Sequence, residues 1–148
     1  MKNYYDAGAR FSKWRAVITI GDQIPSSQCI ELNAILLARY AITSQEAGLV
    51  PIVEPEVLMD GDHSINTCYE VTNKTLNEVF NQLEKHKVDL PGILLKPNMI
   101  LSGKESSNRA DKNKVAEMTL RCFEETIPEN VPGIIFLFIV AKFDLLAK

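Results

Sequence analysis

The chain has 148 residues, a formal net charge of −3 and 46% hydrophobic residues. These values favour one domain with an ordinary hydrophobic core. No cluster of Lys and Arg suggests nucleic acid, and no apolar run reaches the ~18 residues that a membrane helix needs, so we expect neither partner. The first ten residues lack the apolar stretch of a signal peptide, which predicts a cytoplasmic protein. The three cysteines are far apart in the sequence and are expected to be buried thiols rather than disulfide or zinc ligands.

Four apolar stretches predict β-strands at a spacing of roughly forty residues. They are Phe11–Ile20, Gly48–Val57, Gly92–Lys96 and Gly133–Val140. Strands that are apolar almost throughout are typical of a parallel sheet, whose two faces are both covered.

Between these strands the apolar residues follow the spacing of helices. Thr67 and Glu70 have the spacing of a capping box, and Lys85–Lys87 suit the end of the same helix. The residues predicted to face the core are Ile30, Ala34, Leu37 and Ala41 in the first helix, Cys68, Val71, Leu76, Val79, Phe80 and Leu83 in the second, and Val115, Met118, Cys122 and Phe123 in the third.

The order β-α-β-α-β-α-β predicts an α/β fold with a parallel sheet and right-handed crossovers. A doubly wound sheet and part of a (β/α)8 barrel both fit this order. No GxGxxG or GxxxxGK motif follows a strand, which argues against a nucleotide-binding fold. No linker interrupts the pattern, so residues 1–148 are expected to form a single domain.

Charged residues occur where the predicted strands end or begin. Glu54 and Glu56 are two residues apart, so they project to the same face of an extended strand, and Lys13 and Arg15 share this spacing. Lys96 ends the strand "GILLK". In parallel α/β architectures such residues gather at one edge of the sheet. Each pair read alone also fits solvated loop acids or a basic edge strand, and Trp14, which faces the other way, is expected in the core.

The set taken together suits imine chemistry. Lys96 would attack a carbonyl as the neutral amine, a form that desolvation or a nearby cation such as Lys13 favours. A carboxylate, Glu54 or Glu56, would move protons, and Arg15 would hold a substrate phosphate.

Two further polar segments are expected to be structural. Asp60–His63 reads "DGDH", which lacks the spacing of an EF-hand and is interpreted as a turn. Ser102–Arg109 is interpreted as a solvated loop, with phosphate binding as the alternative.

The motifs "KWR", "GLVPIVEPE" followed by "DGDH", "LLKPNM" and "VPGIIFL" occur in this order between about Gly8 and Leu137. In this combination the chain resembles the class I, Schiff-base fructose-bisphosphate aldolases. The resemblance implies a (β/α)8 barrel that needs no metal or other cofactor. It also implies a sugar-phosphate substrate, fructose 1,6-bisphosphate, which is cleaved reversibly to dihydroxyacetone phosphate and glyceraldehyde 3-phosphate.

The resemblance also implies roles for individual residues. Lys96 matches the lysine that forms the Schiff base, and Lys13 matches a second active-site lysine. Glu54 matches the acid that moves protons, and Glu56 the carboxylate close to the Schiff-base lysine. Arg15 matches an arginine that binds substrate.

The chain departs from the family pattern in two ways. A whole barrel takes about 250 residues, so 148 residues are expected to supply roughly half, the fourth to seventh strands. After Leu137 the family's "SGGQ" phosphate loop is replaced by a divergent tail, 138–148, as a shifted reading frame or a truncated gene would produce. The alternative function is therefore a non-catalytic fragment that acts as an assembly module. Because a half barrel leaves unpaired strand edges, we expect a homo-oligomer or aggregation.

Overall fold

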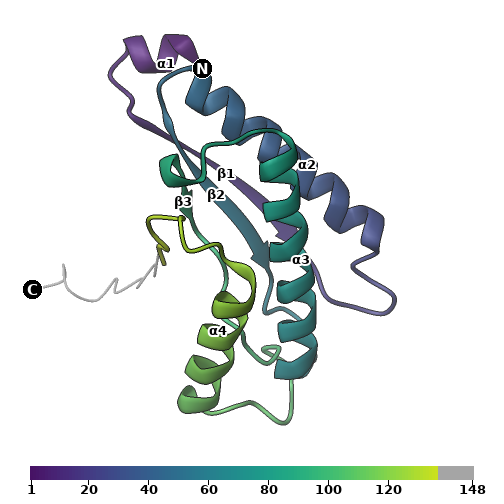
Figure 1. Cartoon of the computed structure of the whole chain (residues 1–148). Coiled ribbons are helices and arrows are strands. Elements are labelled where there is room, and N and C mark those ends of the chain that lie inside the picture. The colour runs from purple at the N-terminus through teal and green to yellow at the C-terminus, as the bar shows by residue number, and fades with distance from the viewer. Residues whose placement is uncertain (137–148) are drawn as a thin grey trace, which may run out of the picture.

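The structure is a computed structural model that describes residues 1–136 (Figure 1). Its three strands form one parallel sheet in the order β1-β2-β3. In chain order, the elements are α1 (Lys2–Asp6), β1 (Phe11–Ile18), α2 (Ser27–Glu46), β2 (Val50–Val57), α3 (Ile65–Lys85), the 3-10 helix η1 (Leu90–Gly92), β3 (Leu94–Leu95) and α4 (Lys112–Thr126).

The predicted α/β class with parallel strands is confirmed for the described residues. The first three predicted strands are present with shorter bounds, and β3 pairs with β2 over only two residues. Of the predicted strand Gly133–Val140, only the first four residues are described. Among these, Ile134 forms a parallel bridge with Leu95, so this segment runs beside β3, while the remainder of the predicted strand lies outside the described residues.

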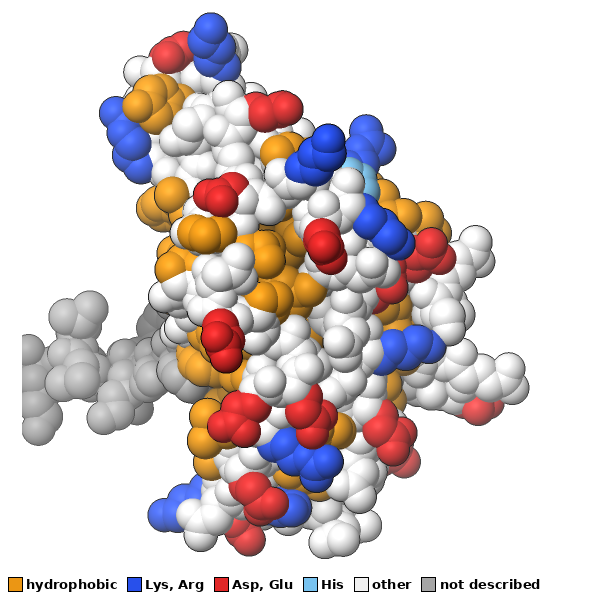
Figure 2. All heavy atoms as spheres, in the orientation of Figure 1, with side chains coloured by type: hydrophobic (Ala, Val, Ile, Leu, Met, Phe, Trp, Pro, Cys, Tyr) orange, Lys and Arg blue, Asp and Glu red, His pale blue; other side chains and the backbone are white. Residues whose placement is uncertain are grey.

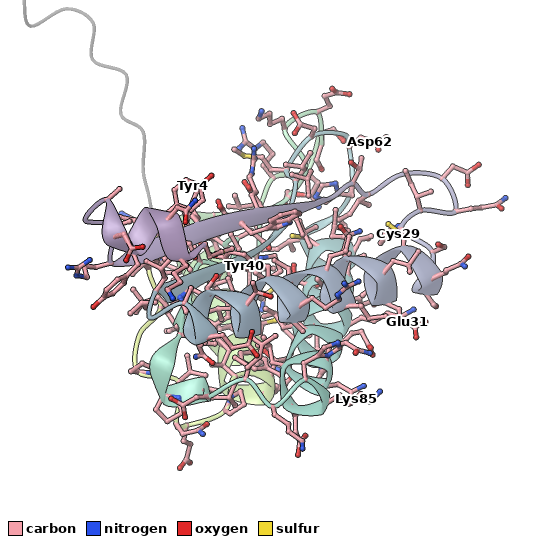
Figure 3. The ribbon with its side chains drawn as sticks, turned by 90° about the horizontal axis from the view of Figure 1, so that it is seen from above. Tyr4, Cys29, Glu31, Tyr40, Asp62 and Lys85 are labelled. Atoms are coloured by element: carbon pink, nitrogen blue, oxygen red, sulfur yellow. The ribbon has the colours of Figure 1, made fainter. Side chains whose placement is uncertain are left out.

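The core lies between the sheet and the helices α2, α3 and α4, which Figure 1 shows side by side next to it. The predicted helix faces are confirmed, with Val71 and Val115 only half-buried at their margins. Figure 3 shows α2 running along the strands, with Tyr40 between the helix and β1. On the sheet, Ala16, Ile18, Val53, Val57 and Leu95 are the buried residues that complete this layer.

Trp14 is 47% exposed, so its prediction as a core residue is wrong. The side chain is on the helix face of β1, where its ring lies 5.8 Å from the ring of Tyr40. In the part of the chain that the structure describes, β1 is an edge strand, so no further strand lies on the outer side of Trp14.

The helix starts are set by side chains that accept backbone hydrogen bonds. Ser26 accepts from Cys29 at the start of α2, and Asp111 caps α4. The capping box predicted at Thr67 is wrong, because Ser64 Oγ accepts from Thr67 N and α3 therefore begins one turn earlier. The predicted end of α3 at Lys85–Lys87 is confirmed, since the helix ends at Lys85.

The turn after β2 and the loop after β3 are joined backbone to backbone. Gly103 N donates to His63 O at 2.8 Å, Lys104 N to Met59 O at 2.7 Å, and Glu105 N to Gly61 O at 2.9 Å. Ser102 and Gly103 are buried by this contact, so only the later part of the loop expected to be solvated, from Lys104 onward, is largely exposed.

The helical face of the molecule carries charges of both signs. Figure 2 shows acidic and basic side chains interspersed there, with hydrophobic atoms between them. Among the described residues, no helix is both long and apolar enough to cross a bilayer.

The joined loops predict that Gly103→Ala destabilises the fold strongly. A Cβ atom at Gly103 would lie 2.2 Å from Gly61 O and 2.9 Å from His63 N, so the two loops would have to separate. We expect a loss of about 3 kcal/mol in the free energy of unfolding, measured by urea denaturation.

The matched control is Gly8→Ala, where a Cβ meets nothing within 4 Å but the backbone φ is +103°. It should lose only about 1 kcal/mol, the cost of backbone strain alone. Equal losses in the two variants would show that the loop contact is not tight.

Candidate active site

Strand register brings the predicted charged residues to one face of the sheet. Arg15 is paired with Glu54 across β1 and β2, and Lys13 and Glu56 lie two residues from them on the same face. Lys96 follows the pair Val53↔Leu95 directly and so continues the register opposite Glu54. This face is opposite to the one that packs on the helices.

Glu54 bridges two lysines from different strands. Its Oε1 accepts from Lys96 Nζ at 2.5 Å, and its Oε2 accepts from Lys13 Nζ at 2.6 Å. The carboxylate is 2% exposed, whereas the side chains of Lys96 and Lys13 are 16% and 44% exposed. Both carboxylate oxygens are thus paired with ammonium groups, which is how a buried charge is tolerated.

The pKa of Glu54 is lowered from its ordinary value of 4.5. Burial acts in the opposite direction and is the largest single influence, but the hydrogen bonds and charges of Lys13 and Lys96 together outweigh it. Glu54 is therefore a carboxylate at neutral pH, and it can accept a proton.

Arg15 and Glu56 form a second ion pair beside the first. Arg15 Nε donates to Glu56 Oε2, and this hydrogen bond raises the pKa of the guanidinium. Arg15 is 48% exposed and Glu56 is 27% exposed, so a planar cation is presented at the surface of the sheet. A guanidinium in this position suits a phosphate group.

A cavity of about 180 Å³ opens at the carboxyl ends of β2 and β3. Lys96 is part of its wall, so a carbonyl compound entering it would meet the amine. The lining residues are Glu56, Val57, Met59, Lys96, Pro97, Asn98, Met99, Leu101 and Phe136.

The structure brings all five predicted residues together, but it pairs them differently from the expectation. The carboxylate in contact with Lys96 is Glu54 rather than Glu56, which holds Arg15 instead. Asn98, which the sequence analysis did not single out, also lies at the site and bonds to Val57 N. Its only sequence signal is its place two residues after Lys96. Within residues 1–136, no three His, Cys, Asp or Glu side chains are close enough to hold a metal ion together.

A protein-family model described as Fructose-bisphosphate aldolase class-I matches residues 1–139. The chain belongs to the class-I fructose-bisphosphate aldolase family. A probable class 1 aldolase of Xanthomonas campestris pv. campestris is 56% identical over 137 residues, which cover 93% of this chain and 41% of that protein. Cytosolic fructose-bisphosphate aldolase 4 of Arabidopsis thaliana is 49% identical over 136 residues, covering 92% of this chain and 35% of that protein.

A solved aldolase has the same fold over the shared region. The fructose-bisphosphate aldolase of Plasmodium falciparum, crystallised with TRAP and a small-molecule inhibitor, superposes with a TM-score of 0.89 at 46% identity. The match covers 91% of this chain and 40% of that one. The chain thus spans about two fifths of the aldolases that it matches.

The bridge formed by Glu54 predicts a characteristic pH dependence of stability. Because the pKa of Glu54 in the folded state is below 4.5, its contribution is fully present above pH 4.5 and is lost as the pH falls through the folded value. Glu54→Gln removes this contribution and leaves two lysines without their counter-charge. We expect it to cost about 3 kcal/mol at pH 7, with the difference from the unmodified chain shrinking below pH 4.5.

Urea denaturation at pH 7 and at several values below pH 4.5 measures this difference. Glu117→Gln, which removes a carboxylate paired with Lys114 on the surface of α4, is the control and should shift stability by less than about 1 kcal/mol. A Glu54→Gln difference that stays constant with pH would contradict the prediction.

Proposed function

We propose that this chain carries the imine-forming part of a fructose-bisphosphate aldolase and that Lys96 is its nucleophile. The observation that supports this most directly is the Lys96–Glu54–Lys13 bridge, in which Lys96 also lines a cavity at the strand ends. It places an amine, a buried carboxylate and a second cation within one hydrogen-bonded group, which is what reversible imine chemistry needs.

The proposed reaction begins when Lys96 Nζ passes a proton to Glu54 and the resulting neutral amine attacks the ketone carbon of fructose 1,6-bisphosphate. Loss of water from the carbinolamine gives an iminium ion. Removal of the proton from the C4 hydroxyl breaks the C3–C4 bond, whose electron pair passes to the iminium nitrogen, and glyceraldehyde 3-phosphate leaves. Protonation of the resulting enamine and hydrolysis then release dihydroxyacetone phosphate and restore the amine.

The other residues take supporting roles in this proposal. Glu54 is the group that moves protons, because its carboxylate already contacts the Lys96 nitrogen. Lys13 holds Glu54 from the opposite side, and Arg15 binds a substrate phosphate. Glu56 orients the Arg15 guanidinium and lines the cavity.

The proposal extends to the architecture and the setting of the chain. The parallel sheet with Ile134 beside β3, and the likeness to two fifths of a solved aldolase, support a partial (β/α)8 barrel formed as a single domain by residues 1–148. Relatives named as cytosolic support a cytoplasmic location. The alternative, a non-catalytic fragment, becomes one outcome of the following test.

Reductive trapping tests the proposal directly. When the chain is incubated with dihydroxyacetone phosphate and borohydride, we expect a stable adduct on Lys96, located by mass spectrometry of peptides. Lys96→Arg keeps the charge but cannot form the imine and should give none, whereas Lys74→Arg on the exposed side of α3 should leave adduct formation unchanged. No adduct on Lys96 in the unmodified chain would favour the non-catalytic fragment.

We also propose that the chain forms a homo-oligomer through the edge strand β1. Phe11, Trp14 and Val17 are exposed along this strand at 64%, 47% and 41%, and exposed apolar edges recruit other chains. Size exclusion with light scattering at low micromolar concentration should show a dimer or larger species. Val17→Lys should shift the population toward monomer, because an edge charge opposes strand pairing, and a sharp monomer peak for the unmodified chain would refute the proposal.

A further inference from the structure

The backbone hydrogen bonds between β2 and β3 stop next to the contact between Lys96 and Glu54. Lys96 N donates to Val53 O at 2.8 Å, which is the last backbone bond between these strands among the described residues. Backbone groups alternate sides along a strand, so Val53, Pro55 and Val57 all face β3. Pro55 has no N–H to continue the pairing.

The side chain of Asn98 takes over where the backbone pairing ends. Its Oδ1 accepts from Val57 N at 3.0 Å, and its Nδ2 donates to Thr72 Oγ1 and to Met99 O, both at 3.1 Å. Val57 is 3% exposed and Thr72 is 1% exposed, so these groups have no ready access to water. One amide therefore joins the end of β2, the segment after β3 and helix α3.

The rest of that segment is anchored to the helices in the same manner. Ile100 N donates to Thr119 Oγ1 of α4 at 3.0 Å, and Leu101 N donates to Cys68 Sγ of α3 at 3.5 Å. Burial raises the pKa of the Cys68 thiol, so it accepts this bond as a neutral group. Of these anchors, Asn98 is the one that also bonds to β2. It does so at Val57, three residues beyond Glu54.

We propose that Asn98 is a positioning residue that sets the separation between Lys96 and Glu54. The link joins Asn98 to Val57. Lys96 lies two residues before Asn98, and Glu54 lies three residues before Val57. Without the link, the ends of β2 and β3, whose backbone pairing stops at Pro55, are free to separate, and the 2.5 Å contact between the amine and the carboxylate is no longer enforced. The catalytic side of this inference rests on the proposed function.

The experiment compares Asn98→Ala with two milder variants and a control in the full chain. Asn98→Asp keeps an oxygen for Val57 N but loses the donor to Thr72, and Thr72→Val removes the acceptor while preserving shape. Asn81→Ala changes an exposed asparagine of α3 whose side chain hydrogen-bonds only to Glu78 among the described residues. Two readouts are taken for each: the maximal rate of reductive trapping with dihydroxyacetone phosphate, and the rate at which acetic anhydride labels Lys96 relative to the exposed Lys112.

We expect Asn98→Ala to lower the maximal trapping rate roughly tenfold to a hundredfold, the scale of an ångström misplacement, with little change in the half-saturating concentration. Lys96 labelling should rise severalfold as its contact with Glu54 loosens. Asn98→Asp and Thr72→Val should fall between Asn98→Ala and the unmodified chain, and Asn81→Ala should match the unmodified chain. A double Asn98→Ala, Thr72→Val variant should be no worse than Asn98→Ala, because both changes break one link.

Labelling separates the two claims. If the unmodified chain gives no adduct, the proposed function fails, while a rise in Lys96 labelling for Asn98→Ala still supports positioning. Unchanged Lys96 labelling in a folded Asn98→Ala or Asn98→Asp variant overturns the positioning role, whatever the trapping shows. A lower trapping rate that only follows a lower folded fraction, measured by thermal unfolding, overturns it as well.

Discussion

The site depends on one buried carboxylate. Glu54 is 2% exposed, and leaving its charge unpaired at that depth would cost several kcal/mol. Two ammonium groups from the neighbouring strands satisfy both oxygens, so the charge stays and its pKa remains low. The strand order β1-β2-β3 has the acid in the middle and a lysine on each side, which is the arrangement that lets one residue collect both partners.

The remainder of the sheet supports this arrangement through its two faces. The side chains of Ala16, Val53 and Leu95 point toward the helices and form the core, while the residues next to them in sequence point the other way. Helices α2 and α3 therefore hold the strands in register without touching the charged face. A one-residue slip of β1 against β2 would bury Lys13 among the core residues and expose Ala16, so core packing also fixes the ion pairs.

Much of this arrangement could be predicted from the sequence, because it follows from periodicity. Alternation by two put Glu54 and Glu56 on one face, and helical spacing identified the buried sides of α2, α3 and α4. Pairing between strands could not be predicted in the same way, since both glutamates have equal claims on Lys96 until the register is known. The exposure of Trp14 depends on β1 being an edge strand, an alternative that Lys13 and Arg15 leave open but do not decide.

The roles of small polar residues and glycines depend on contacts that are distant in the sequence. Asn98 looks like a loop residue, and its importance comes from Pro55, which is 43 positions away and ends the backbone pairing. Ser64 and Thr67 both carry hydroxyls that suit a helix start, so the sequence alone does not decide which of them caps α3. Gly103 gives no signal at all, because the need for glycine there arises from the approach of Gly61 in another loop.

The sequence distances across the bridge have a consequence for how the chain folds. Lys13 and Glu54 are 41 residues apart, and Glu54 and Lys96 are 42 apart, so each contact closes only when a complete strand–helix–strand unit has formed. Contacts this distant form slowly, because the entropy of closing the loop is lost before the contact gives anything back. In an intermediate with only β1 and β2 paired, Glu54 contacts the ammonium of Lys13 alone. The oxygen that Lys96 would contact has no partner until β3 is in place. The acid thus penalises a half-assembled sheet and favours all-or-none folding of the two units.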